Sequence, residues 1–166
     1  MFEPKCEKMV MAFGTFDYFH AGHENYLKQA KTLGDYLIVV IARDRTARQI
    51  KGAAPAVSER KRAATVRKSG IADKVILGEH GDKHKVIKKY RPAVIALGYD
   101  QFVFTQKLRK TLIDLKLDAA VKRLDAYFPQ VYKSSLLKNR TLDREITPLK
   151  PITPLKPEAT LNRQYA

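Results

Sequence analysis

The sequence predicts a single α/β domain of the Rossmann-like, three-layer type, with a mainly parallel five-stranded sheet. Three observations favour this class. Short apolar runs rich in β-branched residues alternate with segments whose apolar residues recur at helical spacing. Strands that alternate with helices in this way form parallel sheets with right-handed crossovers. The chain has 166 residues, which favours one domain, and 45% of them are hydrophobic, which is enough for a core.

Two strands and one helix are predicted before residue 43. Residues 9–13 form the first apolar run, and a helix with one apolar face follows residue 23. Gly34 stands where a helix C-terminal glycine is expected. Residues 36–42, YLIVVIA, form a continuous apolar run that fits a parallel strand covered on both faces. Residues 43–57 are polar and basic, and they predict a loop.

Three more strands and four more helices are predicted after residue 57. Ser58 suits an N-cap and Glu59 suits the first turn of the helix that follows. The expected strands are residues 74–77, 93–97 and 119–123, and the expected helices are residues 58–68, 82–90, 105–117 and 133–140.

The periodicity stops near residue 141. The sequence ITPLKP occurs twice in succession, at residues 146–151 and 152–157, and its prolines exclude a helix. We therefore expect a folded domain over residues 1–140 and a proline-containing, flexible tail over residues 141–166. A docking peptide for a partner is the other interpretation of the repeat.

The stretch GTFDYFHAGH, residues 14–23, lies between the first strand and the first helix. Such a junction presents free backbone N–H groups and the positive end of a helix dipole to an anion. His20 and His23 add side-chain donors, while Gly14 and Gly22 let the backbone approach a ligand without an intervening Cβ. The stretch predicts a phosphate-binding site. A similar turn follows the fourth strand at residues 98–100, so the two turns are expected to face each other across one crevice.

Two other roles exist for the histidine pair. The histidines can be purely structural, or they can bind a metal ion. A catalytic zinc site usually needs three protein ligands, and no third ligand lies nearby in the sequence. His80 and His84, with Asp82 between them, are better explained by an exposed loop and helix start. We therefore expect no metal site built from protein ligands.

The pattern Gly-x-Phe-Asp-x-x-His-x-Gly-His resembles the signature of the cytidylyltransferase-like nucleotidyltransferases. The resemblance implies the HxGH nucleotidyltransferase type of fold for residues 1–140. Further segments look like the stand-alone, archaeal-type FAD synthases, which adenylate FMN. The resemblance thus implies transfer of AMP from ATP to FMN, with FAD and pyrophosphate as products. The segments that carry it are residues 43–44, 51–52, 73–74, 76–78 and 96–101.

The same resemblance implies the site residues. The catalytic group would be His20, His23 and Lys51, the last on the loop after the second strand. The groups that bind the nucleotide would be Gly14, Thr15, Phe16, His20, Ala21, Gly22, His23, Asp100, Tyr127, Lys133, Ser134 and Ser135. The role of Tyr127 is inferred from its position in the sequence alone. Relatives often carry arginine in place of Lys133, and a lysine keeps the charge but loses the bidentate fork.

The chemistry of the site favours a phosphorylated acceptor. Attack at the α-phosphate needs donors where charge develops, which the two histidines can supply. A hydroxyl acceptor would also need a general base, whereas a phosphate monoester has a second pKa of about 6 and is already a dianion. No base is evident beyond the histidines, and Asp17 is expected to bind backbone N–H groups of the turn. Mg²⁺ is expected on the triphosphate, held mainly by phosphate oxygens and water.

An isoalloxazine ring needs a broad apolar surface. Four aromatic side chains would provide one if they line the crevice. They are Phe102, Phe104, Tyr127 and Phe128.

Composition constrains the partners. Lys and Arg number 32 against 17 acidic residues, a formal net charge of +15 that favours anionic partners. The charges lack the interleaved aromatics of RNA-binding proteins, so we do not expect nucleic acid. No apolar run is long enough to span a bilayer and no signal-peptide region precedes the first strand, so we expect a cytoplasmic protein without a membrane partner.

The residues leave two other functions open. ATP and CTP enzymes share the histidine signature, so a cytidylyltransferase that makes CDP-glycerol or a similar CDP-alcohol is the main competitor. A non-catalytic nucleotide- or RNA-binding module would account for the net charge, although the intact histidine pair argues against it. Related enzymes are often homodimers, so a homodimer is one option.

Overall fold

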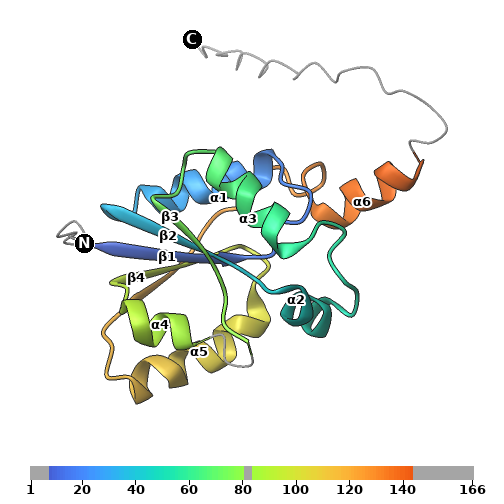
Figure 1. Cartoon of the computed structure of the whole chain (residues 1–166). Helices are drawn as coiled ribbons and strands as arrows, with labels where there is room; N and C mark the ends of the chain where they lie inside the picture. Colours follow the sequence, from blue (N-terminus) through green and yellow to red (C-terminus); the bar gives the residue numbers. More distant parts are fainter. Residues whose placement is uncertain (1–7, 81–83, 144–166) are drawn as a thin grey trace, which may run out of the picture.

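The computed structural model describes residues 8–80 and 84–143, and within them the five strands form one parallel sheet (Figure 1). The strand order is β3-β2-β1-β4-β5. The predicted fold class is therefore confirmed. The ITPLKP repeat lies outside the described residues. The strands are β1 (Met9–Gly14), β2 (Tyr36–Ile41), β3 (Lys74–Leu77), β4 (Val94–Leu97) and β5 (Ala120–Arg123).

Helices cover both faces of the sheet. Helices α1 (Ala21–Lys31) and α3 (Glu59–Lys68) lie on one face, and α4 (Lys85–Tyr90) and α5 (Phe102–Asp114) lie on the other (Figure 1). Two more helices lie at the end of the sheet where the strands terminate, namely α2 (Asp44–Lys51) and α6 (Ser134–Asp143). None of the helices in residues 8–80 and 84–143 has the length and apolar character needed to cross a membrane.

The two faces of the central strands supply two hydrophobic clusters. Val10 and Ala12 of β1 point into the cluster under α1 and α3, while Met11 and Phe13 point into the cluster under α4 and α5. Side chains alternate between faces along a strand, so a continuous apolar run is buried on both sides. Leu27 of α1 is fully buried against this sheet, a burial that stabilises the fold by about 1.5–3 kcal/mol.

The boundaries differ from the prediction in informative places. Helix α2 was not predicted, since only Ala47 of its residues is buried and the segment is short and mostly polar. Gly34 was wrongly assigned as a C-terminal cap: α1 ends at Lys31 and its C-cap, Thr32, is in a right-handed conformation. A glycine is needed at position 34 because a Cβ there would collide with the Lys8 carbonyl. Helix α5 begins earlier than expected, and α6 continues past residue 140 to Asp143. Part of the predicted helix 82–90 lies outside the described residues.

Strand order decides where a ligand can bind. The chain moves outward from β1 to β2 and β3, then returns to the other side of β1 for β4 and β5. Loops after β1 and β4 therefore diverge to opposite faces, which opens a crevice beyond their carboxyl ends. The predicted phosphate-binding turn follows β1 directly.

Candidate active site

A cavity of about 450 Å³ opens at the carboxyl ends of β1 and β4. It is lined by the turn after β1, the turn after β4, helix α2 and the start of α6. Gly14 and Gly98 both line it, so the predicted opposition of the two turns is confirmed. Polar groups from four distant parts of the chain converge on one largely apolar hollow, which is the usual character of a small-molecule site.

The structure brings nearly all the predicted site residues to this cavity. Ala21 does not line it and instead begins α1. Lys51 lines the cavity from the last turn of α2 rather than from a loop, and Gly52 ends that helix in a left-handed conformation with φ of 74°. The lining residues among those predicted are Gly14, Thr15, Phe16, His20, Gly22, His23, Lys51, Asp100, Tyr127, Lys133, Ser134 and Ser135.

The two glycines of the turn serve side chains of the protein. A Cβ at Gly14 would lie 2.7 Å from the Phe16 ring, and a Cβ at Gly22 would lie 2.9 Å from the His20 ring. Each glycine therefore also makes room for a neighbouring ring, while its approach to a ligand stays a prediction. Phe16 is itself buried in the core, with φ of 55°, and packs edge-on against His23.

His20 is both a cap and a cavity residue. It is the N-cap of α1, and its Nδ1 accepts a hydrogen bond of 3.1 Å from the Gly22 backbone N–H. An accepting Nδ1 carries no proton, so the neutral ring must carry its proton on Nε2. Nε2 is buried and has no hydrogen-bond partner among the described residues. The cap therefore fixes His20 as a donor with its N–H unused by the protein.

His23 stacks on His20, with ring centroids 3.8 Å apart. The pKa of His23 is lowered to about 3, mainly by burial and also by the nearby charges of His20 and Lys51. Burial also lowers the pKa of His20. Both rings are therefore neutral near pH 7 without a ligand. The buried Nδ1 of His23 also lacks a partner within the described chain. An anion at the edge of the stacked pair that accepts hydrogen bonds from His20 Nε2 and His23 Nδ1 would satisfy both nitrogens.

This burial predicts a pH-dependent stability. The pKa of His23 is about 3 in the folded protein against 6.5 for a free histidine, so the unfolded chain binds a proton that the folded protein does not. The resulting stabilisation is complete above pH 6.5 and is lost as the pH falls towards 3, by about 1.4 kcal/mol per pH unit.

Urea unfolding of the wild type and His23→Asn between pH 7 and pH 4 tests this. As the pH falls, the free energy of unfolding of the wild type is expected to decrease more than that of His23→Asn. A pH-independent difference would contradict a neutral, buried His23.

Two side chains tie the ends of β1 and β4 together. The buried Tyr26 hydroxyl donates to the Ala96 carbonyl at 2.9 Å and contacts both the N–H and the carbonyl of Phe13. Gln101 Nε2 donates to the Phe13 carbonyl at 2.6 Å. Tyr26 lies on the apolar face expected for the helix after residue 23, yet its hydroxyl also holds the ends of β1 and β4 at a fixed distance.

Arg62 is a fully buried guanidinium beneath the site. It donates to the backbone carbonyls of Thr15, Ala42 and Val57 and forms an ion pair of 2.7 Å with Asp44. These carbonyls belong to the turn after β1, the end of β2 and the loop before α3. Arg62 therefore joins three segments around the cavity. Sequence reasoning missed it, because its partners are scattered along the chain.

Acidic side chains add further hydrogen bonds between the segments around the cavity. Asp17 is buried, and its carboxylate accepts hydrogen bonds of 2.9 and 3.0 Å from the backbone N–H groups of Ala56 and Val57. The sequence predicted that Asp17 binds backbone N–H groups of its own turn. In the structure it binds those of a distant loop instead. Asp44 and Glu59 each accept a hydrogen bond from the other's backbone N–H, which joins the starts of α2 and α3.

The start of α6 closes the cavity beside the histidines. Ser134 Oγ donates to the Asp17 carbonyl at 2.8 Å. The Tyr132 ring stacks against His20 at 6.2 Å between centroids, and Tyr127 stacks against Tyr132 at 5.8 Å. Ser135 and Lys133 line the cavity next to them. The phosphate-binding segment predicted near residue 133 therefore lies beside His20.

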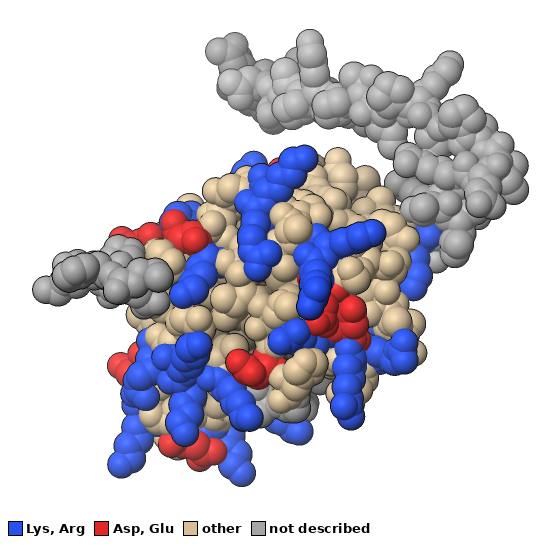
Figure 2. Space-filling model, viewed as in Figure 1, with Lys and Arg blue, Asp and Glu red and all other residues tan. Residues whose placement is uncertain are grey.

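The cavity combines cations and acids. Arg43, Lys51 and Lys133 line it, as do three acidic residues, Glu79, Asp100 and Asp125. Elsewhere on the face shown in Figure 2, Lys and Arg are spread over both helix layers, with acidic residues among them. No cluster of three or more His, Cys, Asp or Glu side chains suited to a metal ion occurs in the part of the chain that the structure describes. The cations and the histidine pair suit a phosphorylated ligand.

Comparisons with known proteins agree with this geometry. The FAD synthase of Thermoplasma volcanium is 38% identical over 134 residues, which cover 81% of this chain and 94% of that protein. The FAD synthase of Pyrococcus abyssi is 38% identical over 141 residues, which cover 84% of this chain and 93% of that one. The FAD synthase of Ferroglobus placidus is 41% identical over 119 residues, which cover 72% and 77% of the two chains.

Solved structures share the fold. A lipopolysaccharide core biosynthesis protein from Thermoplasma volcanium is 40% identical, with a TM-score of 0.68 over 72% of this chain and 98% of that one. A protein of unknown function from Archaeoglobus fulgidus is only 17% identical but has a TM-score of 0.60 over 70% and 89% of the chains. The family model described as Cytidylyltransferase-like matches residues 11–140, which include the histidine pair and the start of α6. The chain therefore belongs to the cytidylyltransferase-like family of nucleotidyltransferases.

Proposed function

We propose that this protein is an FAD synthase that transfers AMP from ATP to FMN. The observation that carries the proposal is the stacked His20–His23 pair, which lines the cavity at the start of α1 and has one buried nitrogen on each ring without a partner among the described residues. The identity with FAD synthases over most of the chain supports AMP and FMN as the two partners. No observation favours CTP with a glycerol acceptor or a non-catalytic binding module.

The reaction is a single in-line displacement. A phosphate oxygen of FMN attacks the α-phosphorus of ATP, a new P–O bond forms, and the bond from that phosphorus to the β-phosphate bridging oxygen breaks. Pyrophosphate leaves with the negative charge. His20 donates from Nε2 to an α-phosphate oxygen, a role that its cap prepares before substrate binds. His23 is placed to donate to the same group, and such fixed donors stabilise the charge that develops in the transition state.

Two further parts of the site are proposed for the triphosphate, namely Lys51 and the segment at the start of α6. Lys51 approaches from α2, and its effect on His23 shows that it lies within electrostatic range of the pair. Lys133, with Ser134 and Ser135, lies where α6 begins, and free N–H groups at a helix start suit the β- and γ-phosphates. These cations would hold pyrophosphate as it leaves.

Mg²⁺ is proposed to enter with ATP. The cavity offers separate carboxylates such as Asp100 rather than a preformed metal cluster among the described residues. Mg²⁺ typically keeps several waters and binds through substrate phosphates with one or two carboxylates, so this donor set fits. The ion would neutralise phosphate charge during the transfer.

Direct assay tests the function. The protein is mixed with Mg²⁺, FMN and either ATP or CTP, and the flavins are separated by chromatography. FAD formed with ATP and not with CTP is the expected result, together with one pyrophosphate per FAD. Formation of CDP-glycerol from CTP and glycerol 3-phosphate, without any FAD, would contradict the proposal.

A further inference from the structure

Phe102 is a large apolar side chain that remains open at the cavity. Its side chain lines the cavity, yet the residue is 65% exposed. The Arg123 guanidinium covers the ring from one side, with its central carbon 4.6 Å from the ring centroid. Such cation–π contact orients the ring. The large exposed fraction leaves the remaining surface of the ring accessible to a ligand.

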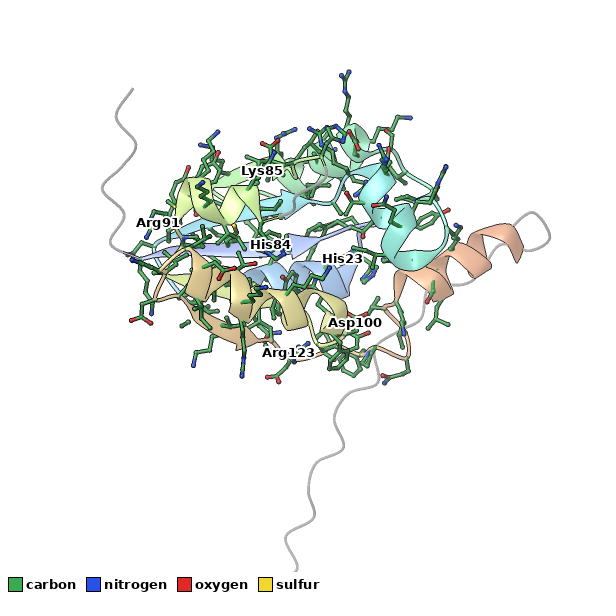
Figure 3. The ribbon with its side chains drawn as sticks, turned by 90° about the horizontal axis from the view of Figure 1, so that it is seen from below. His23, His84, Lys85, Arg91, Asp100 and Arg123 are labelled. Atoms are coloured by element: carbon green, nitrogen blue, oxygen red, sulfur yellow. The ribbon has the colours of Figure 1, made fainter. Side chains whose placement is uncertain are left out.

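The position of this pair is set by the turn after β4. Gln101, the N-cap of α5, donates a hydrogen bond from Nε2 to the Phe13 carbonyl. The helix that begins with Phe102 is therefore held at the end of β1. Arg123 donates from the same nitrogen to the carbonyls of Gly98, at 2.9 Å, and Tyr99, at 3.2 Å. Figure 3 shows Arg123 and Asp100 near each other at this end of the sheet. The Phe102 ring and the Arg123 guanidinium are therefore both held by the turn after β4.

We infer that Phe102, oriented by Arg123, is the surface on which the isoalloxazine ring of FMN stacks. The inference rests on the activity proposed above and adds the residue that recognises the acceptor. A flat, tricyclic ring gains most from a broad aromatic surface, and a ring that is already fixed loses little conformational entropy when it binds. Phe102 thereby favours flavin over small polar acceptors such as glycerol phosphate.

The other aromatic group of the cavity suits the nucleotide instead. Tyr127 stacks on Tyr132, and Tyr132 stacks on His20, next to Lys133. They adjoin the groups proposed for the triphosphate, whereas Phe102 is carried by the turn after β4. ATP and FMN must both fit around the α-phosphate for an in-line displacement. Assigning Phe102 to FMN gives each substrate its own aromatic surface.

Exposure alone would not support this assignment. Single exposed apolar side chains are common on protein surfaces. Ile113 is such a case, since it is 76% exposed on the same helix and does not line the cavity. Phe102 differs from it by its place in the cavity and by the guanidinium that orients it. Ile113→Ala is therefore a matched control.

Steady-state kinetics test the inference. Phe102→Ala is expected to raise the KM for FMN by about 10-fold to 100-fold, the range expected from loss of one aromatic stacking partner. The KM for ATP should stay unchanged, Phe102→Tyr should restore the KM for FMN, and Ile113→Ala should behave as wild type. An unchanged KM for FMN, or a rise confined to ATP, would overturn the inference.

Binding of FMN in the absence of ATP separates this inference from the proposed function. Flavin fluorescence anisotropy measures the affinity of wild type and Phe102→Ala without turnover. Weaker binding to the variant supports the stacking surface even if no FAD is formed, and FAD formation with equal FMN affinity for both proteins overturns it. Wild type that fails to bind FMN overturns both proposals.

A tryptophan at position 102 would report direct contact with the bound flavin. The chain contains no tryptophan, so Phe102→Trp introduces a single indole. This variant should retain FMN affinity and quench the fluorescence of the bound flavin more strongly than wild type does. Equal quenching in the two proteins, at saturating FMN, would place the isoalloxazine away from residue 102.

Discussion

Replacing His20 or His23 by alanine is expected to lower kcat for FAD formation by about 100-fold or more, the usual effect of removing one fixed donor from a developing oxyanion. Both nitrogens are buried at the cavity and neither is used by the described residues of the protein. The loss should therefore appear in turnover rather than in folding. Single-turnover measurements with saturating ATP and FMN separate the chemical step from binding.

His20→Ala has a complication that a second variant removes. The alanine also deletes the N-cap of α1, a loss of about 1 kcal/mol in stability. His20→Asn keeps a capping side chain but withdraws the ring N–H from the phosphate. It should therefore lose turnover with little loss of stability. His80, which is exposed and does not line the cavity, provides the control His80→Ala. Near wild-type turnover of both His20 and His23 variants would remove the mechanism proposed here.

Arg62→Met is expected to lower the free energy of unfolding by about 3–5 kcal/mol, because it removes a fully buried guanidinium that donates to three backbone carbonyls, and each acceptor left without a donor costs about 1–3 kcal/mol. For a chain of this size the melting temperature should fall by about 10 °C. The carbonyls that lose their donor are those of Thr15, Ala42 and Val57. Since these carbonyls frame the cavity, kcat should fall even at temperatures where the variant is folded.

A matched variant and a double mutant sharpen this test. Arg60 lies on the same helix but is exposed, so Arg60→Met should change the melting temperature little. Asp44→Asn relieves the charge left alone when Arg62 is removed. The double variant should therefore lose less stability than the sum of the two single variants. An Arg62→Met protein as stable as Arg60→Met would show that the buried network is dispensable.

The sequence predicted best what lies close together along the chain. His20, Gly22 and His23 form one short pattern, so the turn that we propose to bind phosphate was visible without a structure. The parallel sheet was equally visible, because burial on both faces produces continuous apolar runs. Helix α2 was hidden by its exposure, although Gly52 after Lys51 matches the usual signal for the end of a helix.

Long-range polar contacts were beyond sequence reasoning. Arg62 looks like any other arginine on a basic helix, and only the fold brings distant carbonyls to its guanidinium. Tyr26 appeared as one member of an apolar face, yet its hydroxyl bonds to strands that are far apart along the chain. Phe102 was expected to offer apolar surface, but the guanidinium that orients it is supplied by β5.

The hydrogen bond from Ser134 to Asp17 joins residues that are 117 positions apart. Contacts of such long sequence separation close a large loop, and their entropic cost slows their formation. During synthesis the histidine turn leaves the ribosome early, whereas the segment that completes the cavity is among the last of the domain to emerge. A nascent chain that already has its first strands and helices still lacks the wall beside His20. The site proposed for the triphosphate is therefore complete only when the whole domain is present.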